Sequence, residues 1–458
     1  MRLVLNRVER GRYLDSVAAM RLSRRLAALP GIEDAAVMIG SPSNKALLRD
    51  AGLLAAEGEG ATPNDLVVAL RASDERAGRG VLDSALNLMS ERIETEAVPR
   101  FRSQATALDH LPRANLALIS VPGEFAAQEA RKALGAGLNA LVFSSGVPLE
   151  EERALKLLAR GKGLLLMGPD CGSALIAGTP LAFANAVPRG DIGIVSASGT
   201  GLQEVSCLIA RMGGGISHGI GVGGRDLDER VGALGTLAAV DALEGDAGTR
   251  TIVLISKPPA PRVAEHVLER VARCAKRSVV CFLGLEKPGL ARTLREAAEM
   301  ATGSKIHEEG PGRKSKIKGS VRGLYCGGTL CSEAELIFRG KGLKQHRFVD
   351  LGDEKYARNR PHPMIEPELR NDHVAAALAD PEVGVILVDL VLGYGAHPDP
   401  AGVLLEQKLS SKVVIASVTG TDDDPQGWSR QVAKLRTAGV LVAPSNAHAA
   451  ELAASLVG

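Results

Sequence analysis

Aromatic residues are scarce in this chain: phenylalanine, tryptophan and tyrosine together make up 3% of its 458 residues. So few aromatic side chains leave little material for the stacking surfaces that bind nucleic-acid bases. The chain also has almost no net charge, since 55 basic and 53 acidic residues give +2. It therefore lacks the positive excess typical of proteins that bind a phosphate backbone, and we expect no nucleic-acid partner.

Hydrophobic runs are short as well. No apolar stretch approaches the roughly 20 residues that cross a bilayer, and the charged residues Arg2, Arg7 and Glu9 interrupt the start, where a signal peptide would be apolar. The six cysteines form no CxxC pair, which is typical of reduced thiols. We therefore expect a cytoplasmic protein with no membrane partner.

Metal-binding patterns are missing too. The histidines are scattered, and His346, His362 and His373 show no HxxxH spacing. No GxxxxGK[ST] nucleotide-binding loop occurs. We expect no resident metal, although a magnesium ion that accompanies phosphate would leave no sequence signature.

The chain does contain two similar turns of the size that holds a phosphate. The first is Ser196-Ala197-Ser198-Gly199-Thr200 and the second is Cys326-Gly327-Gly328-Thr329. Each turn follows an apolar strand and opens a helix, so unpaired backbone N–H groups and the positive end of a helix dipole face one point. The sequence therefore predicts one phosphate held between two helices. The predicted phosphate-binding residues are Ser198, Gly199, Thr200, Gly327, Gly328 and Thr329.

The spacing of predicted strands and helices favours a multidomain α/β protein. Residues 1–95 follow a β-α-β-β-α order typical of a ferredoxin-like domain that assembles or regulates. Residues 96–187 alternate strand and helix as in a Rossmann-like, doubly wound parallel sheet. Residues 188–302 and 319–458 repeat one strand–turn–helix order and are joined by a Gly-, Lys- and Arg-rich linker at 303–318.

Ligands of open parallel sheets sit at the carboxyl ends of strands, where this chain places Gly168-Pro169-Asp170-Cys171-Gly172. Asp170 and Cys171 are therefore candidate substrate contacts. Arg225 follows another apolar strand and could hold a substrate carboxylate with its two-pronged guanidinium. An ordinary pair between Arg225 and the adjacent Asp226 is an equally good interpretation.

Several motifs together resemble a known family. Gly168-Pro169-Asp170-Cys171 and the segment 193–200 resemble the alpha subunit of succinyl-CoA synthetase, and the segment from residue 319 on resembles the CoA-ligase domain of its beta subunit. With the N-terminal domain, the segment 199–204 and the segment 360–367, the chain is identified as a member of the FdrA family. The resemblance implies that 96–187 is a CoA-binding-type domain. It also implies that 188–302 and 319–458 are flavodoxin-like ligase domains of the alpha and beta type.

The departures from the synthetase concern its phosphate relay. Where the synthetase carries a phosphohistidine, residues 286–296 contain no histidine, and its supporting glutamate matches Lys257. A lysine beside two helix N-termini favours a phosphate dianion. No stretch is large enough for an ATP-grasp module, and the early CoA-binding loop has no counterpart, so we expect CoA not to be a cofactor.

Two more residues are catalytic candidates beside Lys257. Asp389 ends a strand at the place equivalent to Lys257 in the other repeat, where it could act in catalysis or pair with Lys257. His362 lies between two prolines and could be the general acid for a departing amide, or simply an exposed loop histidine.

The FdrA resemblance implies a carbamoyltransferase of the oxamate type, active in purine or allantoin catabolism. Phosphate and a ureido acid such as oxalurate would give carbamoyl phosphate and an amide acid. The same resemblance implies companion enzyme subunits, and the N-terminal domain type favours a homo-oligomer. The alternatives are an NDP-forming acyl-CoA synthetase and a non-catalytic protein that binds CoA or an acyl phosphate.

Overall fold

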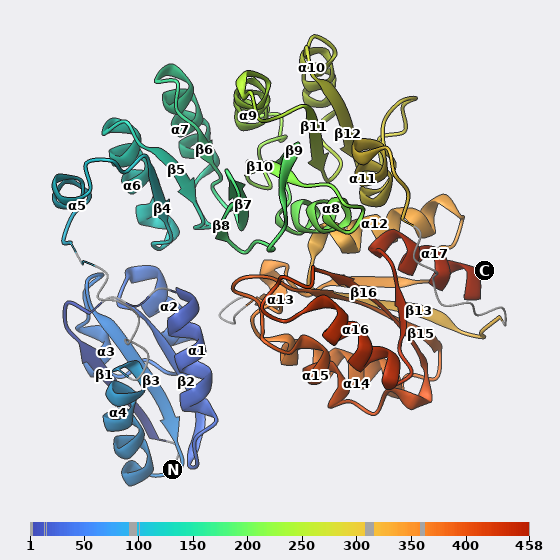
Figure 1. Ribbon diagram of the computed structural model, residues 1–458. Coiled ribbons are helices and arrows are strands. Elements are labelled where there is room, and N and C mark those ends of the chain that lie inside the picture. Colours follow the sequence, from blue (N-terminus) through green and yellow to red (C-terminus); the bar gives the residue numbers. More distant parts are fainter. Residues whose placement is uncertain are drawn as a thin grey trace. The chain divides into compact units, whose positions relative to one another are not determined.

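The computed structural model describes residues 3–12, 14, 16–90, 99, 101–306, 316–357 and 362–457 (Figure 1). Most of the predicted linker, residues 307–315, and the predicted motif residues Arg360 and Pro361 lie outside the described residues. The chain forms two compact units. The first consists mainly of residues 1–114 and the second of nearly all the rest.

The first unit contains a three-stranded antiparallel sheet in the order β1-β3-β2. Hydrophobic clusters pack on both faces of this sheet: Leu26 and Leu70 belong to one cluster, and Leu48 and Val67 to the other. Its elements are β1 (Leu3–Glu9), α1 (Ser16–Ala27), β2 (Ile32–Ile39), α2 (Pro42–Asp50), α3 (Ala56–Glu59), β3 (Leu66–Ala72), α4 (Glu75–Ser90) and α5 (Gln104–His110).

The strands of this unit match the predicted β-α-β-β-α order, but α2 and α3 lie between β2 and β3, where that order has no helix. Ser41 accepts a hydrogen bond from the Asn44 backbone N–H, and Pro42 occupies the first helical turn. Serine at the cap followed by proline is a strong helix-start signal, and the polar composition of the segment concealed it.

The second unit begins with a small parallel sheet in the order β4-β5-β6. This part contains β4 (Leu116–Ile119), α6 (Gly123–Gly135), β5 (Asn139–Val142), α7 (Leu149–Gly161) and β6 (Leu166–Met167). Parallel strands joined by helices match the doubly wound pattern expected for residues 96–187.

Two larger sheets follow. The first, in the order β12-β11-β9-β10-β7-β8, is built by β7 (Ser173–Ile176), β8 (Thr179–Ala182), β9 (Arg189–Ser196), α8 (Gly199–Arg211), β10 (Ile216–Gly221), α9 (Leu234–Gly245), β11 (Thr251–Ser256), α10 (Pro261–Ala272), β12 (Arg277–Phe282) and α11 (Leu294–Thr302). The second, in the order β14-β13-β15-β16-β17, is parallel throughout. It is built by β13 (Ser320–Tyr325), α12 (Gly328–Gly340), β14 (Arg347–Asp350), α13 (Glu354–Ala357), η1 (Pro367–Arg370), α14 (Asn371–Ala379), β15 (Val383–Val391), α15 (Pro400–Leu405), η2 (Leu409–Ser411), β16 (Val413–Thr419), α16 (Trp428–Thr437), β17 (Leu441–Ala443) and α17 (Asn446–Val457).

In the structure, the boundary predicted between residues 187 and 188 lies earlier, before β7. The hairpin β7–β8 lies within the predicted 96–187 domain, yet β7 pairs antiparallel with β10 of the next sheet. A short antiparallel hairpin can extend the edge of a parallel sheet without a crossover helix, which the strand and helix pattern alone does not reveal.

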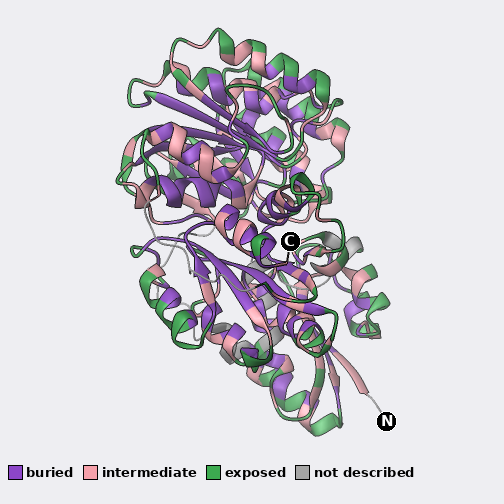
Figure 2. Ribbon diagram, turned by 90° about the vertical axis from the view of Figure 1, so that its right-hand side faces the viewer, coloured by how far each residue is buried: buried purple, intermediate pink, exposed green. Residues whose placement is uncertain are grey.

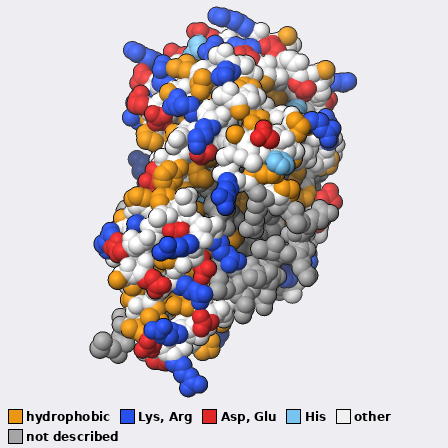
Figure 3. Space-filling model, turned by 90° about the vertical axis from the view of Figure 1, so that its left-hand side faces the viewer, with side chains coloured by type: hydrophobic (Ala, Val, Ile, Leu, Met, Phe, Trp, Pro, Cys, Tyr) orange, Lys and Arg blue, Asp and Glu red, His pale blue; other side chains and the backbone are white. Residues whose placement is uncertain are grey.

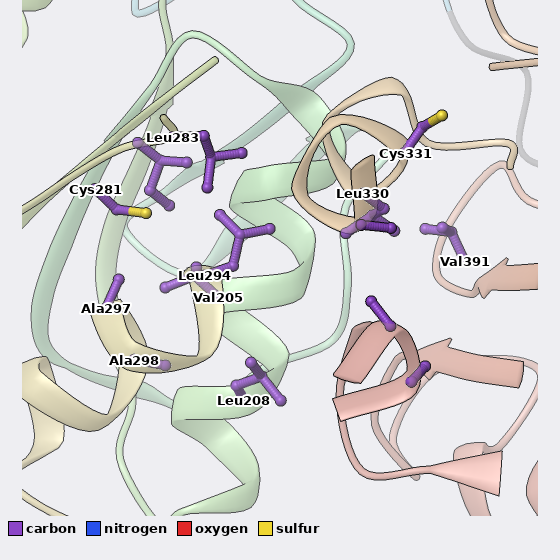
Figure 4. Packing of buried hydrophobic residues seen from close by; sticks show 14 of the residues in the cluster. Val205, Leu208, Cys281, Leu283, Leu294, Ala297, Ala298, Leu330, Cys331 and Val391 are labelled. Atoms are coloured by element: carbon purple, nitrogen blue, oxygen red, sulfur yellow. The ribbon is translucent and has the colours of Figure 1, made fainter. Parts of the chain in front are cut away.

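The two repeats share one hydrophobic core. Val205 and Leu208 of α8 and Leu294 of α11 belong to the same buried cluster as Leu330 of α12 and Val391 of β15 (Figure 4). Apart from β8 and β14, the strands of both sheets are buried over most of their length (Figure 2). Continuous burial of this kind holds the two helix N-termini in a fixed relation, because packed interiors resist deformation.

Two buried glutamates join the repeats reciprocally. The Asn446 backbone N–H at the start of α17 donates to Glu204 Oε1 of α8 at 3.0 Å. The Leu294 backbone N–H at the start of α11 donates to Glu333 Oε1 of α12 at 2.6 Å. Each repeat therefore caps a helix of the other, which explains why both helices carry an acidic residue in their second turn.

The Glu333 cap makes a pH-dependent contribution to stability. Burial raises the pKa of Glu333 to about 7 from 4.5, so between these values the native state holds a proton that the unfolded state releases. Its contribution is fully present below about pH 4.5 and decreases as the pH rises to about 7. The stability of the wild type can be compared with that of Glu333→Gln as a difference in unfolding free energy. We expect this difference to fall as the pH rises over this interval, by at most about 1.4 kcal/mol for each pH unit. A difference that rises or stays flat in denaturant titrations would contradict this.

Among the described residues, no helix is both long and apolar enough to pass through a bilayer. On the face drawn in Figure 3, acidic and basic side chains are interspersed, in keeping with the near-neutral net charge.

Candidate phosphate site

The N-termini of α8 and α12 meet. Ser198 Oγ and Thr329 Oγ1 lie 2.5 Å apart and share a hydrogen bond. A methyl group built on Gly327 would come within 3.1 Å of Thr200 Cβ. The structure thus brings the two predicted turns together, although they are separated by more than a hundred residues in the sequence.

The first turn leaves two backbone donors available. Ser198 caps α8, because its Oγ accepts from the Gly201 backbone N–H at 2.9 Å, and the Ala197 N–H donates to the Ile255 carbonyl. Within the described ranges, the backbone N–H groups of Gly199 and Thr200 have no hydrogen-bond partner. These two groups can therefore bind an anion.

The second turn is partly filled by a side chain. Asp389 Oδ1 accepts from the Cys326 N–H and Asp389 Oδ2 from the Gly327 N–H, both at 2.7 Å. In this turn the anion-binding donors are the N–H groups of Gly328 and Thr329, for which the described residues offer no acceptor. The Gly327 N–H, a predicted phosphate ligand, is already occupied.

Asp389 is a structural anchor of this turn. It is 0% exposed, and Arg370 approaches it with Nη1 at 3.5 Å from Oδ1 and also donates to its carbonyl. Burial raises the pKa of Asp389 to about 6, while Arg370 and the two backbone donors oppose that rise. A side chain so enclosed cannot touch a substrate, so the geometry argues against the catalytic role expected for Asp389.

The pairing of the strands also shows which residue of the first repeat corresponds to Asp389. Val388 lies opposite Leu324, which places Asp389 beside the last residue of β13, just as Ile255 lies opposite Ser196 at the end of β9. Asp389 therefore corresponds to Ile255 and not to Lys257. The expected Lys257–Asp389 pair does not form, because Asp389 is satisfied by Arg370 and the turn.

Lys257 is the exposed cation beside the second turn. It follows β11, and a methyl group built on Gly328 would lie 2.9 Å from its Nζ. Lys257 forms no ion pair with any described residue. An ammonium group next to two helix N-termini is suited to a bound anion.

Asp350, which the sequence analysis did not single out, faces the same point. The same methyl group on Gly328 would lie 2.2 Å from Asp350 Oδ2, and Asp350 Oδ1 accepts from the Gly352 N–H at 3.0 Å. Burial raises the pKa of Asp350 and Lys257 opposes the rise. The only available signal was the position of Asp350 at the end of a strand of the second repeat.

His362 lies beside the loop that follows β14. Its Nδ1 accepts from the Met364 N–H at 3.2 Å, and its Nε2 would lie 2.5 Å from a methyl group built on Gly352. Burial lowers the pKa of His362 to about 4, so the ring is neutral at neutral pH. A neutral imidazole with an occupied Nδ1 is a poor acid, which weakens the expectation that His362 protonates a leaving group.

The other predicted substrate contacts have different surroundings. Asp170 is exposed. A methyl group built on Gly224 would lie 3.9 Å from Asp170 Oδ2 and also 3.9 Å from the Ala197 carbonyl oxygen, which belongs to the first turn. Cys171 is 2% exposed, its thiol donates to the Ser173 carbonyl, and burial raises its pKa to about 12. Cys171 is therefore a core residue, and only Asp170 of the pair can meet a ligand.

Arg225 is engaged in a structural pair. Its Nη2 lies 2.8 Å from Glu152 Oε2 and 2.8 Å from the Val147 carbonyl. The predicted pair of Arg225 with Asp226 is wrong, because the partner of Arg225 is Glu152. Contact of Arg225 with a substrate carboxylate stays a prediction.

Asp226 belongs to a buried charge cluster centred on Lys156. Lys156 Nζ lies 2.8 Å from Glu152 Oε1, 2.7 Å from Asp226 Oδ1 and 2.9 Å from the Val222 carbonyl. Asp226 also accepts from the backbone N–H groups of Gly235 and Thr236 at the start of α9. The cluster joins α7 to the loop after β10. The sequence signal was the Glu152–Lys156 spacing of four residues, which usually indicates a weak surface pair.

Known proteins match nearly the whole chain. A family model described as CoA-ligase matches residues 324–456, and one described as AllF, heavy metal-associated domain, matches residues 1–105. The uncharacterised protein YahF of Escherichia coli (strain K12) is 40% identical to this chain over 97% of each protein.

More distant relatives match parts of the chain. Subunit alpha 2 of ADP-forming succinate–CoA ligase from Archaeoglobus fulgidus is 29% identical and covers 49% of this chain and 76% of its own length. The solved structure of a dinucleotide-forming acetyl-coenzyme A synthetase 1 from Ca. Korarchaeum cryptofilum, in complex with phosphate and ADP, aligns over 80% of this chain and 84% of that one. It has 17% identity and a TM-score of 0.32.

The heavy-metal description does not fit the residues of the N-terminal domain. The first histidine of the chain is His110 and the first cysteine is Cys171, so residues 1–105 contain neither. Heavy-metal sites of this kind depend on such ligands. Throughout the described part of the chain, no cluster of three His, Cys, Asp or Glu residues could hold a metal ion.

Proposed function

Because the chain belongs to the FdrA family of proteins related to succinyl-CoA synthetase, we propose that it transfers a carbamoyl group between a ureido acid and free phosphate. Oxalurate and phosphate would give carbamoyl phosphate and oxamate. The observation that carries the proposal is the meeting of two helix N-termini beside Lys257, with backbone donors from both turns left unpaired.

Free phosphate, instead of a phosphorylated histidine, suits this site. The loop between β12 and α11 contains no histidine from Leu283 to Thr293, so the chain offers no covalent carrier there. Four N–H groups and one ammonium can hold a phosphate dianion without one. The same donors would stabilise the negative charge that develops when phosphate attacks the ureido carbonyl.

Each site residue has a distinct task in this proposal. Gly199, Thr200, Gly328 and Thr329 donate backbone hydrogen bonds to phosphate. Lys257 neutralises part of its charge. Asp389 and Arg370 hold the second turn in place and stay outside the reaction.

The match to a CoA-ligase model over residues 324–456 favours a second candidate, a CoA-dependent acyl transfer. It would require CoA and a nucleotide-dependent partner. An assay with CoA, ATP and succinate distinguishes it from the first candidate, because the carbamoyl reaction needs none of the three.

The test is formation of carbamoyl phosphate from oxalurate and phosphate by the purified chain, alone and with the proteins that co-purify with it. Lys257→Met should raise the phosphate concentration for half-maximal rate by roughly tenfold, because one charge-assisted contact at an exposed position is lost. Lys341→Met is the matched control. Lys341 is exposed at the C-terminal end of α12, the helix whose N-terminus forms the second turn. Its substitution should leave the phosphate concentration for half-maximal rate within twofold of wild type. Equal effects of the two substitutions would remove Lys257 from the site.

A further inference from the structure

The proposed reaction must move one proton. When hydrogenphosphate attacks the ureido carbonyl, a carbon–oxygen bond forms and the carbon–nitrogen bond to the amide acid breaks. The attacking phosphate loses its remaining proton, and the departing nitrogen gains one to become the amide of oxamate. A protonated group beside the phosphate, which gives its proton to the nitrogen and then accepts the proton of the phosphate, would serve both ends.

Most titratable groups near the two turns cannot do this. The ammonium of Lys257 has no lone pair with which to accept a proton. Asp389 is fully buried and both of its oxygens accept backbone hydrogen bonds. The ring of His362 is neutral, with Nδ1 occupied by the Met364 N–H. The Cys326 thiol is buried, and its pKa is raised to about 12.

Among the groups beside the second turn, Asp350 has the geometry that fits. Its Oδ1 is held by the Gly352 N–H, whereas its Oδ2 lies 2.2 Å from where a methyl group on Gly328, the first residue of α12, would be. A carboxylate in this position would repel a phosphate dianion, so a residue meant only to bind phosphate would be neutral or basic. A carboxyl that gains a proton when phosphate arrives avoids the repulsion.

We propose that Asp350 is a catalytic residue that takes up a proton from solvent when phosphate binds, delivers this proton to the departing nitrogen and regains one from the attacking phosphate. This role rests on the proposed carbamoyl transfer. It also entails a separate property, the coupling of phosphate binding to protonation of Asp350. The charged groups that face Asp350 are Lys257 at the end of β11, Lys355 and Asp353 near α13, and Asp389 on β15. Burial favours its protonated form and Lys257 opposes it, which leaves the carboxyl able to change state.

The first test measures inorganic phosphate binding by calorimetry, in buffers of different ionisation enthalpy, for the full chain and for Asp350→Asn. The wild type should take up more protons on binding than Asp350→Asn does. The affinity of Asp350→Asn for phosphate should be unchanged or higher, because asparagine keeps the shape and removes the repulsion. Equal proton uptake by both proteins would overturn the proposal, whatever the chain catalyses.

The second test is turnover. Asp350→Asn should form carbamoyl phosphate about 10² to 10³ times more slowly, within the range of a lost acid–base group, and the pH dependence assigned to this carboxyl should disappear. Asp372→Asn, an exposed aspartate in the first turn of α14 changed in the same way, should stay within twofold. An unchanged rate for Asp350→Asn would contradict its role. If proton coupling is seen but the wild type makes no carbamoyl phosphate, then the proposed function fails while the phosphate-linked protonation of Asp350 stands.

Discussion

Replacing Gly328 by alanine is expected to lower phosphate-dependent carbamoyl transfer by about 10²-fold, the scale of losses caused by displacing catalytic groups by an ångström. The new methyl group would lie 2.2 Å from Asp350 Oδ2 and 2.9 Å from Lys257 Nζ. Both side chains must move away from the turn. The fold should survive, because alanine is a better helix former than glycine and Gly328 is the first residue of α12.

Gly340→Ala provides the matched control for this experiment. Gly340 ends the same helix, and a methyl group built on it meets nothing within 4 Å. Its activity should stay within twofold of wild type. Steady-state rates at varied phosphate concentration, with circular dichroism as a check on folding, make the comparison. Full activity of Gly328→Ala would show that phosphate does not use the start of α12.

Replacing Lys156 by methionine is expected to destabilise the second unit by about 3–5 kcal/mol, the usual cost of breaking a buried ion pair from one side. Methionine keeps most of the side-chain volume, so the loss comes from charge. Glu152 and Asp226 would remain buried without the ammonium that now lies within 2.8 Å of each. Hydrogen exchange of backbone amides in α7 and α9 measures the change where the cluster joins these helices.

Lys162→Met separates this effect from a general loss of positive charge. Lys162 caps the C-terminus of the same helix α7 and is exposed. A surface change of this kind should shift the unfolding free energy by less than about 0.5 kcal/mol. Similar protection factors in the two variants would mean that the cluster contributes little to stability, and its charges would then have to be compensated elsewhere.

The sequence predicted the two turns because their signals are local. An apolar strand, a glycine-rich turn and a helix follow one another within a dozen residues, so the pattern of residue types alone was enough to identify Ser198, Thr200, Gly328 and Thr329. That the two turns meet followed from the repeat itself, and the structure places Ser198 Oγ 2.5 Å from Thr329 Oγ1.

Contacts between distant segments were beyond such reasoning. Asp389 fills the second turn across 63 residues of sequence, and Lys156 reaches Asp226 across 70. No sequence pattern links Asp389 to the second turn or Lys156 to Asp226. The sequence comparison of the two repeats was also wrong by two residues, which matched Asp389 to Lys257 instead of Ile255. Residues two apart on a strand face the same side, so the hydrophobic pattern does not reveal such an error.

The origin of the phosphoryl group in the product decides whether free phosphate is the nucleophile. Oxalurate and ¹⁸O-labelled phosphate would be incubated with the chain and its co-purifying proteins, without nucleotide or CoA. Phosphorus NMR and intact-protein mass spectrometry would follow the label. We expect labelled carbamoyl phosphate to form while the protein mass stays unchanged, since phosphate would react from its site between α8 and α12. A phosphorylated protein, or product only when ATP and CoA are added, would contradict direct attack by phosphate.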